Sequence, residues 1–431
     1  MKWLIYDLLF GVAYLAMLPK FLLRMRRRGG YTERFADRFG IFPLEIRRKL
    51  CDGTRRIWIH AVSVGEVYVA GQFMREFRTQ APETRFVLST TSSTGWKEAQ
   101  KQVAADDVLI YCPLDFRPCV NRVLDLVQPQ ALILTESEIW PNLLRMSAQR
   151  GIPLFLVNAR VSDRSAPRYR KFRFWFGPVL NLFNRIYAQS EMDKERLVDA
   201  GAEAGLIEVT GSVKYDTAIR NPAKEKEIAL WLESGGRSRD ELVLLGGSTW
   251  PGEDEVLLAV YKSLRKRFKK LRLVIVPRHF EKAGSIESNI LKSGFPCIRK
   301  STTPEPKPDA EAVFLADTTG ELMGFYGNAT FVFVGKSLCE HGSQNMIEPC
   351  LCGAVTFVGP NTENFRSVVQ DLLDARALIQ IQDGLDLENN LSMLLEYPEQ
   401  RAEFSDVAQM TVQKRKGVAP ACVKAIRERL K

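Results

Sequence analysis

Short runs of β-branched and other apolar residues recur along this chain and alternate with longer stretches of helical character. This alternation is typical of parallel βα units, in which a helix follows each strand and covers the sheet. Seven runs lie in the first half of the chain, at 56–61, 85–91, 108–113, 131–136, 153–159, 185–190 and 207–212. Seven more lie in the second half, at 241–247, 271–277, 296–301, 312–317, 329–336, 354–360 and 377–382. The pattern predicts an α/β protein with two doubly wound parallel sheets.

The division of these runs into two sets also predicts the domain organisation. A chain of 431 residues is long enough for two domains with separate cores, and the polar stretch 221–240 is the expected linker. We therefore expect Rossmann-like domains at 31–220 and 241–431, with the helical stretch 397–430 packing on either of them. Ligands of such sheets bind beyond the carboxyl ends of the strands. This predicts a cleft between an acceptor-binding first domain and a second domain that binds a nucleotide donor.

The N-terminus begins with an apolar run at 3–18 that is followed by a basic cluster. Residues 1–50 contain 11 Lys or Arg and 4 Asp or Glu, a net charge of +7 out of +10 for the whole chain. The run is shorter than the roughly 20 apolar residues that span a bilayer, and it contains Asp7. Basic residues after such a run favour the cytoplasmic side and anionic lipid. We interpret residues 1–30 as a membrane anchor helix; the alternative is an amphipathic helix that packs on its own protein.

The distribution of charge and cysteine narrows the range of partners. Because most of the excess charge lies at the N-terminus, the folded domains are nearly balanced, and nucleic acid is not expected as a partner. The eight cysteines show neither a disulfide framework nor zinc-ligand spacing, which indicates a reducing compartment and predicts no metal site. Anionic lipid and phosphorylated small molecules remain the expected anionic partners.

A polar segment follows the predicted strand at 56–61, where Ser63, Gly65 and Glu66 open a helix. Ser63 can cap this helix, Gly65 lets a ligand approach the backbone, and the free N–H groups favour an anion. A carboxylate in the first turn, at the mouth of a cleft, is a candidate general base toward a substrate hydroxyl. The alternative is that Glu66 only interacts favourably with the helix dipole.

Two carboxylates follow the predicted strand at 131–136. Glu136 ends the strand and Glu138 comes two residues later, just before Trp140 and Pro141. Placing two carboxylates so close together destabilises the fold unless they have a cationic or hydrogen-bonding task. Glu138 is also compatible with a simple helix-start position, whereas Glu136 is the stronger candidate for a functional role.

Basic residues with aromatic neighbours are concentrated at 158–173. Arg160 and Arg164 open this segment, and arginines there suit phosphate recognition while aromatic rings suit a lipid or sugar face. A solvated basic helix is the alternative interpretation. Lys214 lies at the end of the first half and is expected to reach the cleft from the hinge.

The second half offers a candidate nucleotide pocket built from four strand ends. A Gly-Gly-Ser-Thr sequence after the first strand of this half can cradle phosphate through its backbone N–H groups. All three histidines of the chain, His60, His279 and His341, fall beside the ends of predicted strands, which taken together favours a functional site at these ends. The donor-binding candidates are Ser248, Thr249, Arg278, His279, Lys336, Ser337, Asn345 and Glu348.

Six motifs, in order and spacing, resemble the bacterial 3-deoxy-D-manno-octulosonic acid (Kdo) transferases of lipopolysaccharide assembly. They read H-A-V-S-V-G-E, T-E-S-E-I-W-P-N, N-A-R-V-S-D-R-S, V-T-G-S-V-K-Y-D, V-P-R-H, and V-G-K-S-L with H-G-S-Q-N-M-I-E-P. The resemblance implies a glycosyltransferase B-type fold at the cytoplasmic face of the inner membrane. It also implies transfer of Kdo from CMP-Kdo to the 6′-hydroxyl of a tetraacylated lipid A precursor, with inversion and without a metal or other cofactor.

Carried over residue by residue, the resemblance implies a role for each candidate. Glu66 would be the base, with Glu136 as a second acidic residue directed toward donor or acceptor. Arg278 and Lys214 would bind the CMP phosphate or the Kdo carboxylate, and Asn345 and Glu348 would hold the ribose. Ser63, Gly65, Arg160 and Arg164 would face the acceptor. The chain departs from the family pattern at Lys336, which adds a cation. The alternative function is another nucleotide-sugar transferase or an epimerase with a different donor.

Overall fold

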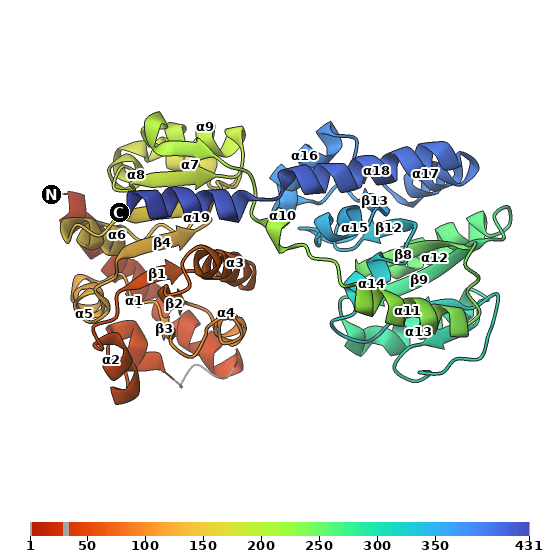
Figure 1. The fold of residues 1–431 in the computed structure, drawn as a ribbon, viewed down its shortest axis with the longest axis horizontal. Helices are drawn as coiled ribbons and strands as arrows, with labels where there is room; N and C mark the ends of the chain where they lie inside the picture. Colours follow the sequence, from red (N-terminus) through yellow and green to blue (C-terminus); the bar gives the residue numbers. More distant parts are fainter. Residues whose placement is uncertain (1, 29–33, 431) are drawn as a thin grey trace. The chain divides into compact units, whose positions relative to one another are not determined.

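The computed structural model describes residues 2–28 and 34–430, which form two compact units. The first unit comprises Met1–Thr217 together with Gly417–Lys431, and the second comprises Ala218–Lys416. Each unit is built around one parallel sheet that helices cover (Figure 1).

The described part of the first unit contains a seven-stranded sheet in the order β3-β2-β1-β4-β5-β6-β7, with every neighbouring pair parallel. All seven strands predicted for the first half are confirmed, each shorter than predicted at one or both ends. They are β1 (Arg56–His60), β2 (Arg85–Thr90), β3 (Val108–Tyr111), β4 (Ala131–Thr135), β5 (Leu154–Ala159), β6 (Arg185–Ala188) and β7 (Ile207–Val209).

Helices cover both faces of this sheet. One layer packs α3 and α19 on the sheet through residues such as Phe73, Phe77 and Val423. The opposite layer packs α5, α6 and α8 through Val120, Leu144 and similar side chains. The bounds are α1 (Lys2–Arg28), η1 (Phe35–Phe39), α2 (Leu44–Leu50), α3 (Val64–Gln80), α4 (Ser93–Ala99), α5 (Arg117–Val127), α6 (Pro141–Gln149), α7 (Ala166–Lys171), α8 (Arg173–Leu180), α9 (Glu191–Asp199), η2 (Ala204–Leu206), α10 (Lys214–Thr217) and α19 (Val418–Arg429).

The second unit repeats this architecture. Its described residues form a seven-stranded sheet in the order β10-β11-β9-β8-β12-β13-β14, again entirely parallel, so the seven strands predicted for the second half are also confirmed. They are β8 (Leu242–Thr249), β9 (Leu271–Pro277), β10 (Cys297–Arg299), β11 (Val313–Leu315), β12 (Phe331–Val334), β13 (Val355–Val358) and β14 (Ile379–Gln380). The helices are α11 (Pro222–Ser234), α12 (Glu253–Leu264), η3 (Phe280–Lys282), α13 (Ala283–Lys292), α14 (Leu322–Tyr326), α15 (Ile347–Leu351), η4 (Glu363–Phe365), α16 (Arg366–Asp374), α17 (Gly384–Glu396) and α18 (Pro398–Arg415).

The unit boundaries differ from the predicted domain ranges in two places. The stretch 221–240, expected to be a linker, contains α11, whose buried Ile228 and Trp231 pack within the second unit. The last helix, α19, returns the chain to the first unit and lies over its sheet (Figure 1). Asp216 fixes the start of α19, because its carboxylate accepts the backbone N–H groups of Gly417 and Ala419, each at 2.6 Å.

Helix α1 packs on the first unit rather than standing apart as an anchor domain. Tyr6 donates its hydroxyl to Asp115 at 2.7 Å, and Asn142 donates to Asp7 at 2.7 Å. The opposite face of α1 is apolar and exposed. Its exposed large side chains are Ile5, Leu8, Leu9, Val12, Leu15, Met17 and Leu23.

The contacts of α1 favour the alternative interpretation, a helix that packs on its own protein, over a separate membrane anchor. One face of α1 is held by its own protein, as the amphipathic alternative requires, while the other face leaves hydrocarbon uncovered. Among the helices formed by the described residues, none is long and apolar enough to cross a membrane.

Candidate active site

The candidate site of the first unit lies where the strand order reverses. Strand β1 pairs with β2 on one side and β4 on the other, so chain segments leaving β1 and β4 diverge at their carboxyl ends. Such a switch point is where ligands of doubly wound sheets bind. Glu66 follows β1, and Glu136 and Glu138 follow β4, so the fold brings three carboxylates from two strand ends to this edge.

Hydrogen bonds orient the Glu66 carboxylate from both sides. Its Oε1 accepts the backbone N–H of Ser63 at 3.3 Å and the Ser63 hydroxyl at 2.8 Å. Its Oε2 accepts the N–H of Val62 at 3.0 Å and the hydroxyl of Thr135 at 3.1 Å. Ser63 in turn accepts the N–H of Glu66, which completes a capping box at the start of α3. The sequence prediction that Ser63 caps this helix is confirmed, and the cap is what points Glu66 toward β4.

Burial raises the pKa of Glu66, and the nearby charge of Glu136 raises it further, against the hydrogen bonds from Val62, Ser63 and Thr135. Glu66 is 8% exposed, whereas the neighbouring residues Ser63 and Gly65 are exposed. A Cβ built on Gly65 would meet only the Ser63 hydroxyl, at 4.0 Å. The space over Gly65 is therefore open to a ligand that approaches Glu66.

Glu136 forms an ion pair with Arg160. The Nε of Arg160 lies 2.6 Å from Oε2 of Glu136, and Nδ2 of Asn158 lies 3.4 Å from Oε1. Glu136 and Asn158 both have a left-handed backbone, with φ of 54° and 53°. That conformation is uncommon for residues other than glycine and is concentrated at functional sites. It turns both side chains toward the same edge of the sheet.

Lys214, the first residue of α10, interacts electrostatically with Glu136 and Arg160. Burial lowers the pKa of Lys214, Glu136 opposes that shift, and Arg160 adds to it, so the three charged groups interact. The Arg160 side chain remains 38% exposed, which leaves it able to meet a ligand as well as Glu136. Arg164 is exposed just before α7 and contributes to the basic surface rather than to this cluster.

Glu138 is the member of the cluster that sequence reasoning left undecided. Burial raises its pKa to about 7, with added repulsion from Glu66 and Glu136. Its Oε2 accepts the indole N–H of Trp140 at 3.0 Å. A carboxyl with a pKa near neutral is a signal of a functional site. The sequence does not show this shift, because it arises from burial and, to a smaller extent, from the approach of Glu66 and Glu136 in space.

The second unit has an equivalent switch point between β8 and β12. Ser248 has a left-handed backbone with φ of 54°, and Thr249 is 3% exposed with a hydroxyl that has no hydrogen-bond partner among the described residues. Gly335 must be glycine here, because a Cβ would lie 2.2 Å from the carbonyl oxygen of Ser248. Two loops thus meet at the carboxyl edge of the second sheet, as predicted.

Glu253 accepts backbone N–H groups from the loop after β12, which is a different segment from the Gly-Gly-Ser-Thr sequence that was predicted to cradle phosphate. This fully buried carboxylate accepts the N–H groups of Lys336 at 2.9 Å, Ser337 at 3.0 Å and Leu338 at 3.1 Å. It also accepts the N–H of Trp250 at 2.8 Å. The loop after β12 is therefore pinned by a residue that sequence reasoning missed, since the pairing joins positions more than eighty residues apart and no local pattern encodes it.

Ser337 does not present its hydroxyl to a ligand in this structure, contrary to the prediction. The residue is fully buried; its hydroxyl donates to the carbonyl of Val334 and accepts the N–H of Gly359 at 2.9 Å. Because one bond goes to the end of β12 and the other to the residue that follows β13, the Ser337 hydroxyl holds the fold of the loop.

Cations and an aromatic ring surround the same edge. The ammonium of Lys336 lies 4.7 Å from the ring centre of Trp250, and the ring of His279 meets Trp250 edge to face at 4.9 Å. Arg278 is exposed at the end of β9. These groups form a positively charged surface next to the unpartnered Thr249 hydroxyl.

Asn345 and Glu348 lie together at the start of α15, as the spacing predicted. The Asn345 amide donates to Oε1 of Glu348 at 3.0 Å and accepts the N–H of Ile347 at 3.1 Å. Burial raises the pKa of Glu348. An amide and a carboxyl held against each other in this way can bind a pair of ligand hydroxyls.

The three histidines divide between the two units. His60 is fully buried in the first unit, where its Nδ1 lies 2.9 Å from the Ser89 hydroxyl and burial lowers its pKa to about 4. His279 and His341 belong to the second unit and pair with Glu281 and Glu363 respectively. Within residues 2–28 and 34–430, no group of three or more His, Cys, Asp or Glu side chains is arranged to hold a metal ion.

Known proteins decide the family of this chain. The profile of a family described as 3-deoxy-D-manno-octulosonic-acid transferase (kdotransferase) matches residues 33–217. The 3-deoxy-D-manno-octulosonic acid transferase of Haemophilus influenzae is 31% identical over 392 residues, which cover 90% of this chain and 89% of that protein. This chain belongs to the Kdo transferase family. The Kdo transferase of Bordetella pertussis is also 31% identical to it, over 400 residues and 89% of each protein.

Solved structures support the fold of this Kdo transferase. UDP-GlcNAc 2-epimerase from Neisseria meningitidis bound to UDP-GlcNAc aligns with a TM-score of 0.58 at 13% identity, covering 86% of this chain and 98% of the epimerase. A glycosyltransferase from Rickettsia africae aligns with the same TM-score at 10% identity, over 88% of this chain and 99% of that protein. At such identities the likeness concerns the fold alone, which is the two-sheet α/β architecture expected of a glycosyltransferase of the B type.

Proposed function

We propose that this transferase moves Kdo from CMP-Kdo to the 6′-hydroxyl of the distal glucosamine of a tetraacylated lipid A precursor, with inversion at the anomeric carbon. The observation that carries the proposal is the cluster of Glu66, Glu136 and Glu138 at the carboxyl edge of the first sheet. Transfer to a hydroxyl requires a base, and a carboxyl of raised pKa beside an open glycine is suited to that role.

Glu66 acts as the general base in this proposal. Thr135 carries one hydroxyl proton, which can go to the carbonyl of His60, at 3.0 Å, instead of to Glu66. That change frees one lone pair on Oε2 of Glu66 for the acceptor hydroxyl. The acceptor oxygen then forms a bond to the anomeric carbon of Kdo, its proton passes to Glu66, and the bond from that carbon to the CMP phosphate oxygen breaks. A single displacement of this kind inverts the anomeric centre and needs no covalent intermediate.

Cations of the chain stabilise the charges of the donor. We assign the CMP phosphate and the Kdo carboxylate to Lys214, Arg278 and Lys336, because electrostatic stabilisation of a departing anion is a large contribution in such reactions. Asn345 and Glu348 hold the ribose hydroxyls through the paired amide and carboxyl. His279 and the loop of Ser248 and Thr249 complete the donor site. The proposal includes no metal or other cofactor.

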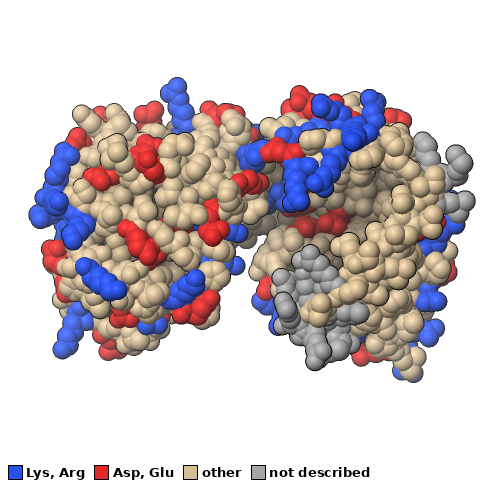
Figure 2. Space-filling model, turned by 180° about the vertical axis from the view of Figure 1, so that it is seen from behind, with Lys and Arg blue, Asp and Glu red and all other residues tan. Residues whose placement is uncertain are grey.

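The acceptor site is assigned to the first unit. Ser63 and Gly65 line the approach to Glu66, Arg160 and Glu136 orient the sugar, and Arg164 with the bases of α7 receives a phosphate of the precursor. Figure 2 shows Lys and Arg side chains gathered over one rim of a hollow in this unit, with acidic side chains inside it. That distribution suits a phosphorylated sugar whose hydroxyl must reach a carboxylate.

The transferase is proposed to work at the cytoplasmic face of the inner membrane. Val12, Leu15 and Met17 are exposed apolar residues of α1, which suits a helix that lies in the plane of the membrane interface rather than one that spans it. The basic residues that follow in the sequence suit contact with anionic lipid.

The role of Glu66 is tested by replacing it with glutamine. Glu66→Gln keeps the shape of the side chain but cannot accept a proton, so kcat should fall by about 10²–10⁴-fold, the usual contribution of a general base. Glu83→Gln, an exposed carboxyl in the turn before β2, is the matched control and should transfer Kdo at the normal rate. If Glu66→Gln retains its full kcat, another group is the base.

A further inference from the structure

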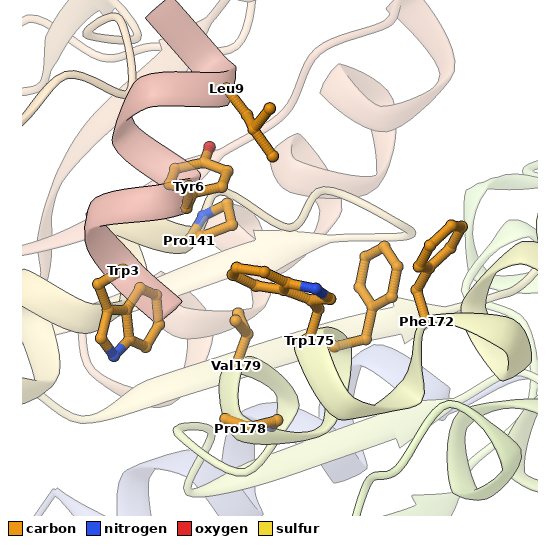
Figure 3. A pocket seen from close by; sticks show the side chains of 9 residues that line it. Trp3, Tyr6, Leu9, Pro141, Phe172, Trp175, Pro178 and Val179 are labelled. Carbon is orange, nitrogen blue, oxygen red and sulfur yellow. The ribbon is translucent and has the colours of Figure 1, made fainter. Parts of the chain in front are cut away.

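An apolar cavity of about 370 Å³ lies in the first unit between α1, α6 and α8 (Figure 3). All nine lining residues are apolar or aromatic. Three helices supply most of its wall: α1 through Trp3, Tyr6 and Leu9, α6 through Pro141, and α8 through residues that include Trp175 and Phe176. A cavity of this size with such a lining is typical of a site for the hydrocarbon part of a ligand.

The wall formed by α1 is fixed in place. The hydroxyl of Tyr6 donates a hydrogen bond to Asp115 at 2.7 Å, and Tyr6 also lines the cavity. The guanidinium of Arg145 lies over the ring of Trp3, 4.8 Å from the ring centre. The cavity is therefore already formed before a ligand arrives, and binding does not have to order this wall.

Aromatic residues connect the cavity with the carboxylate cluster. Phe176, a lining residue, packs on Tyr169 with ring centres 4.3 Å apart. Burial raises the pKa of Tyr169 and the charge of Glu138 raises it further, so the two groups interact electrostatically. Pro141 gives a second connection, because it directly follows Trp140, which donates to Glu138. A ligand with its hydrocarbon in the cavity would hold its polar end near the carboxylate cluster.

The surroundings of the cavity indicate which ligand it takes. The mouth lies at Leu9, which is 59% exposed and belongs to the uncovered apolar face of α1. The side formed by Phe172 lies within the basic segment, whose exposed cations are Arg168, Arg170, Lys171 and Arg173. Hydrocarbon enclosed by the cavity, cations at its side and carboxylates behind it match a phosphorylated, acylated sugar.

We propose that this cavity binds one acyl chain of the acceptor and thereby positions its sugar hydroxyl toward Glu66. This inference rests on the proposed function, because it takes the acceptor to be an acylated glycolipid. It adds a positioning site for the acyl chain, distinct from the residues that contact the reacting atoms. The acyl chain of an ordinary membrane lipid has the same chemistry and is the competing occupant.

The decisive comparison is between two substitutions on neighbouring residues of α1. Leu9→Trp replaces an aliphatic side chain at the mouth of the cavity with a bulky indole ring. Leu8→Trp makes the same change at a residue that is 69% exposed and does not line the cavity. Each purified full-length variant is assayed in one detergent with CMP-Kdo and either the tetraacylated precursor or the same phosphorylated disaccharide without acyl chains.

The proposal predicts a selective effect of Leu9→Trp. Its KM for the tetraacylated precursor should rise by about tenfold, which corresponds to losing the burial of about two methylene groups. Its kcat and its KM for the deacylated acceptor should not change, and Leu8→Trp should match the wild type with both acceptors. Equal KM values for all three proteins would overturn the proposal. An equal rise in both variants would also overturn it, since that result indicates general lipid or micelle contact.

A binding measurement separates this proposal from the proposed function. A precursor analogue with brominated acyl chains should quench tryptophan emission of the wild type, and the quenching should be reduced in Trp175→Phe, which keeps an aromatic wall. If the wild type transfers no Kdo to either acceptor, the proposed function fails while the quenching result still decides whether the cavity takes the chain. Quenching that is unchanged in Trp175→Phe contradicts the proposal.

Discussion

The hydroxyl of Thr135 lies 3.1 Å from Oε2 of Glu66 and 3.0 Å from the carbonyl oxygen of His60. Since a hydroxyl has one proton, it can donate to only one of these acceptors at a time. This choice links the end of β4 to the carboxylate that follows β1. It makes Thr135 a residue that adjusts the basicity of Glu66 without touching the substrate.

Thr135→Val should therefore shift the pH dependence of transfer. The hydrogen bond from Thr135 lowers the pKa of Glu66, so its loss raises that pKa, and the acidic limb of the kcat/KM profile should move to higher pH. Loss of the bond should also cost about 1 kcal/mol of the free energy of unfolding. Thr135→Ser keeps the hydroxyl and should keep the wild-type profile. A Val variant with an unshifted limb would show that Thr135 does not act on the base.

Glu138→Gln should change how stability depends on pH. In the folded protein the pKa of Glu138 is about 7, above the usual value of 4.5. The folded state thus holds the proton more tightly, and the stability from this group is complete below pH 4.5 and lost as the pH rises through 7. The glutamine variant lacks this loss. Relative to the wild type it should gain about 2–3 kcal/mol between pH 5 and pH 8.5.

Urea unfolding at the two pH values measures this difference. Trp140→Phe is the complementary variant, because it removes the hydrogen bond that lowers the pKa of Glu138. Its stability should decline more steeply with rising pH than that of the wild type. A glutamine variant whose stability follows the wild type at both pH values would contradict the raised pKa.

Glu253→Ala should destabilise the second unit and loosen its donor site. The carboxylate accepts four backbone N–H groups, from Trp250 and from residues 336–338. Leaving several of these donors unpaired in a buried site should cost about 3 kcal/mol or more, and the KM for CMP-Kdo should rise because the loop of Lys336 loses its anchor. Glu255→Gln, on the exposed side of the same helix, is the control and should alter neither the melting temperature nor this KM.

Leu15→Asp should weaken binding to lipid without unfolding the protein. Leu15 is 67% exposed on α1, so a carboxylate there removes membrane contact but no core packing. Cosedimentation with vesicles that contain anionic lipid should fall by at least about tenfold. Ile219→Asp in the second unit has the same 67% exposure and serves as the matched control. Equal loss, or no loss, in the two variants would count against membrane contact through α1.

The sequence was most informative where the pattern is local. The fourteen strands were predicted because each contains a short run of mostly apolar residues, and the cap of α3 was predicted from Ser63. The strand ends were less accurate. Glu136, for example, leaves β4 because its left-handed backbone turns it to Arg160, and no local pattern marks that conformation.

The features that escaped prediction depend on contacts between distant segments. Glu253 reads as an ordinary first-turn acid until the fold brings residues 336–338 to it. The return of α19 to the first unit depends on Asp216, two hundred residues away along the chain. His60 was grouped with His279 by its place after a strand, but a period of two along β1 sends its ring into the core.

The most direct test of the central claim is the mass of the product. Full-length protein is incubated with CMP-Kdo and the tetraacylated lipid A precursor, and the lipid is analysed by mass spectrometry, with UDP-GlcNAc as the alternative donor in a parallel reaction. We expect a product heavier by whole Kdo units with CMP-Kdo, no product with UDP-GlcNAc, and almost no product from Glu66→Gln. A precursor of unchanged mass, or one that gains a sugar only from UDP-GlcNAc, would contradict the claim.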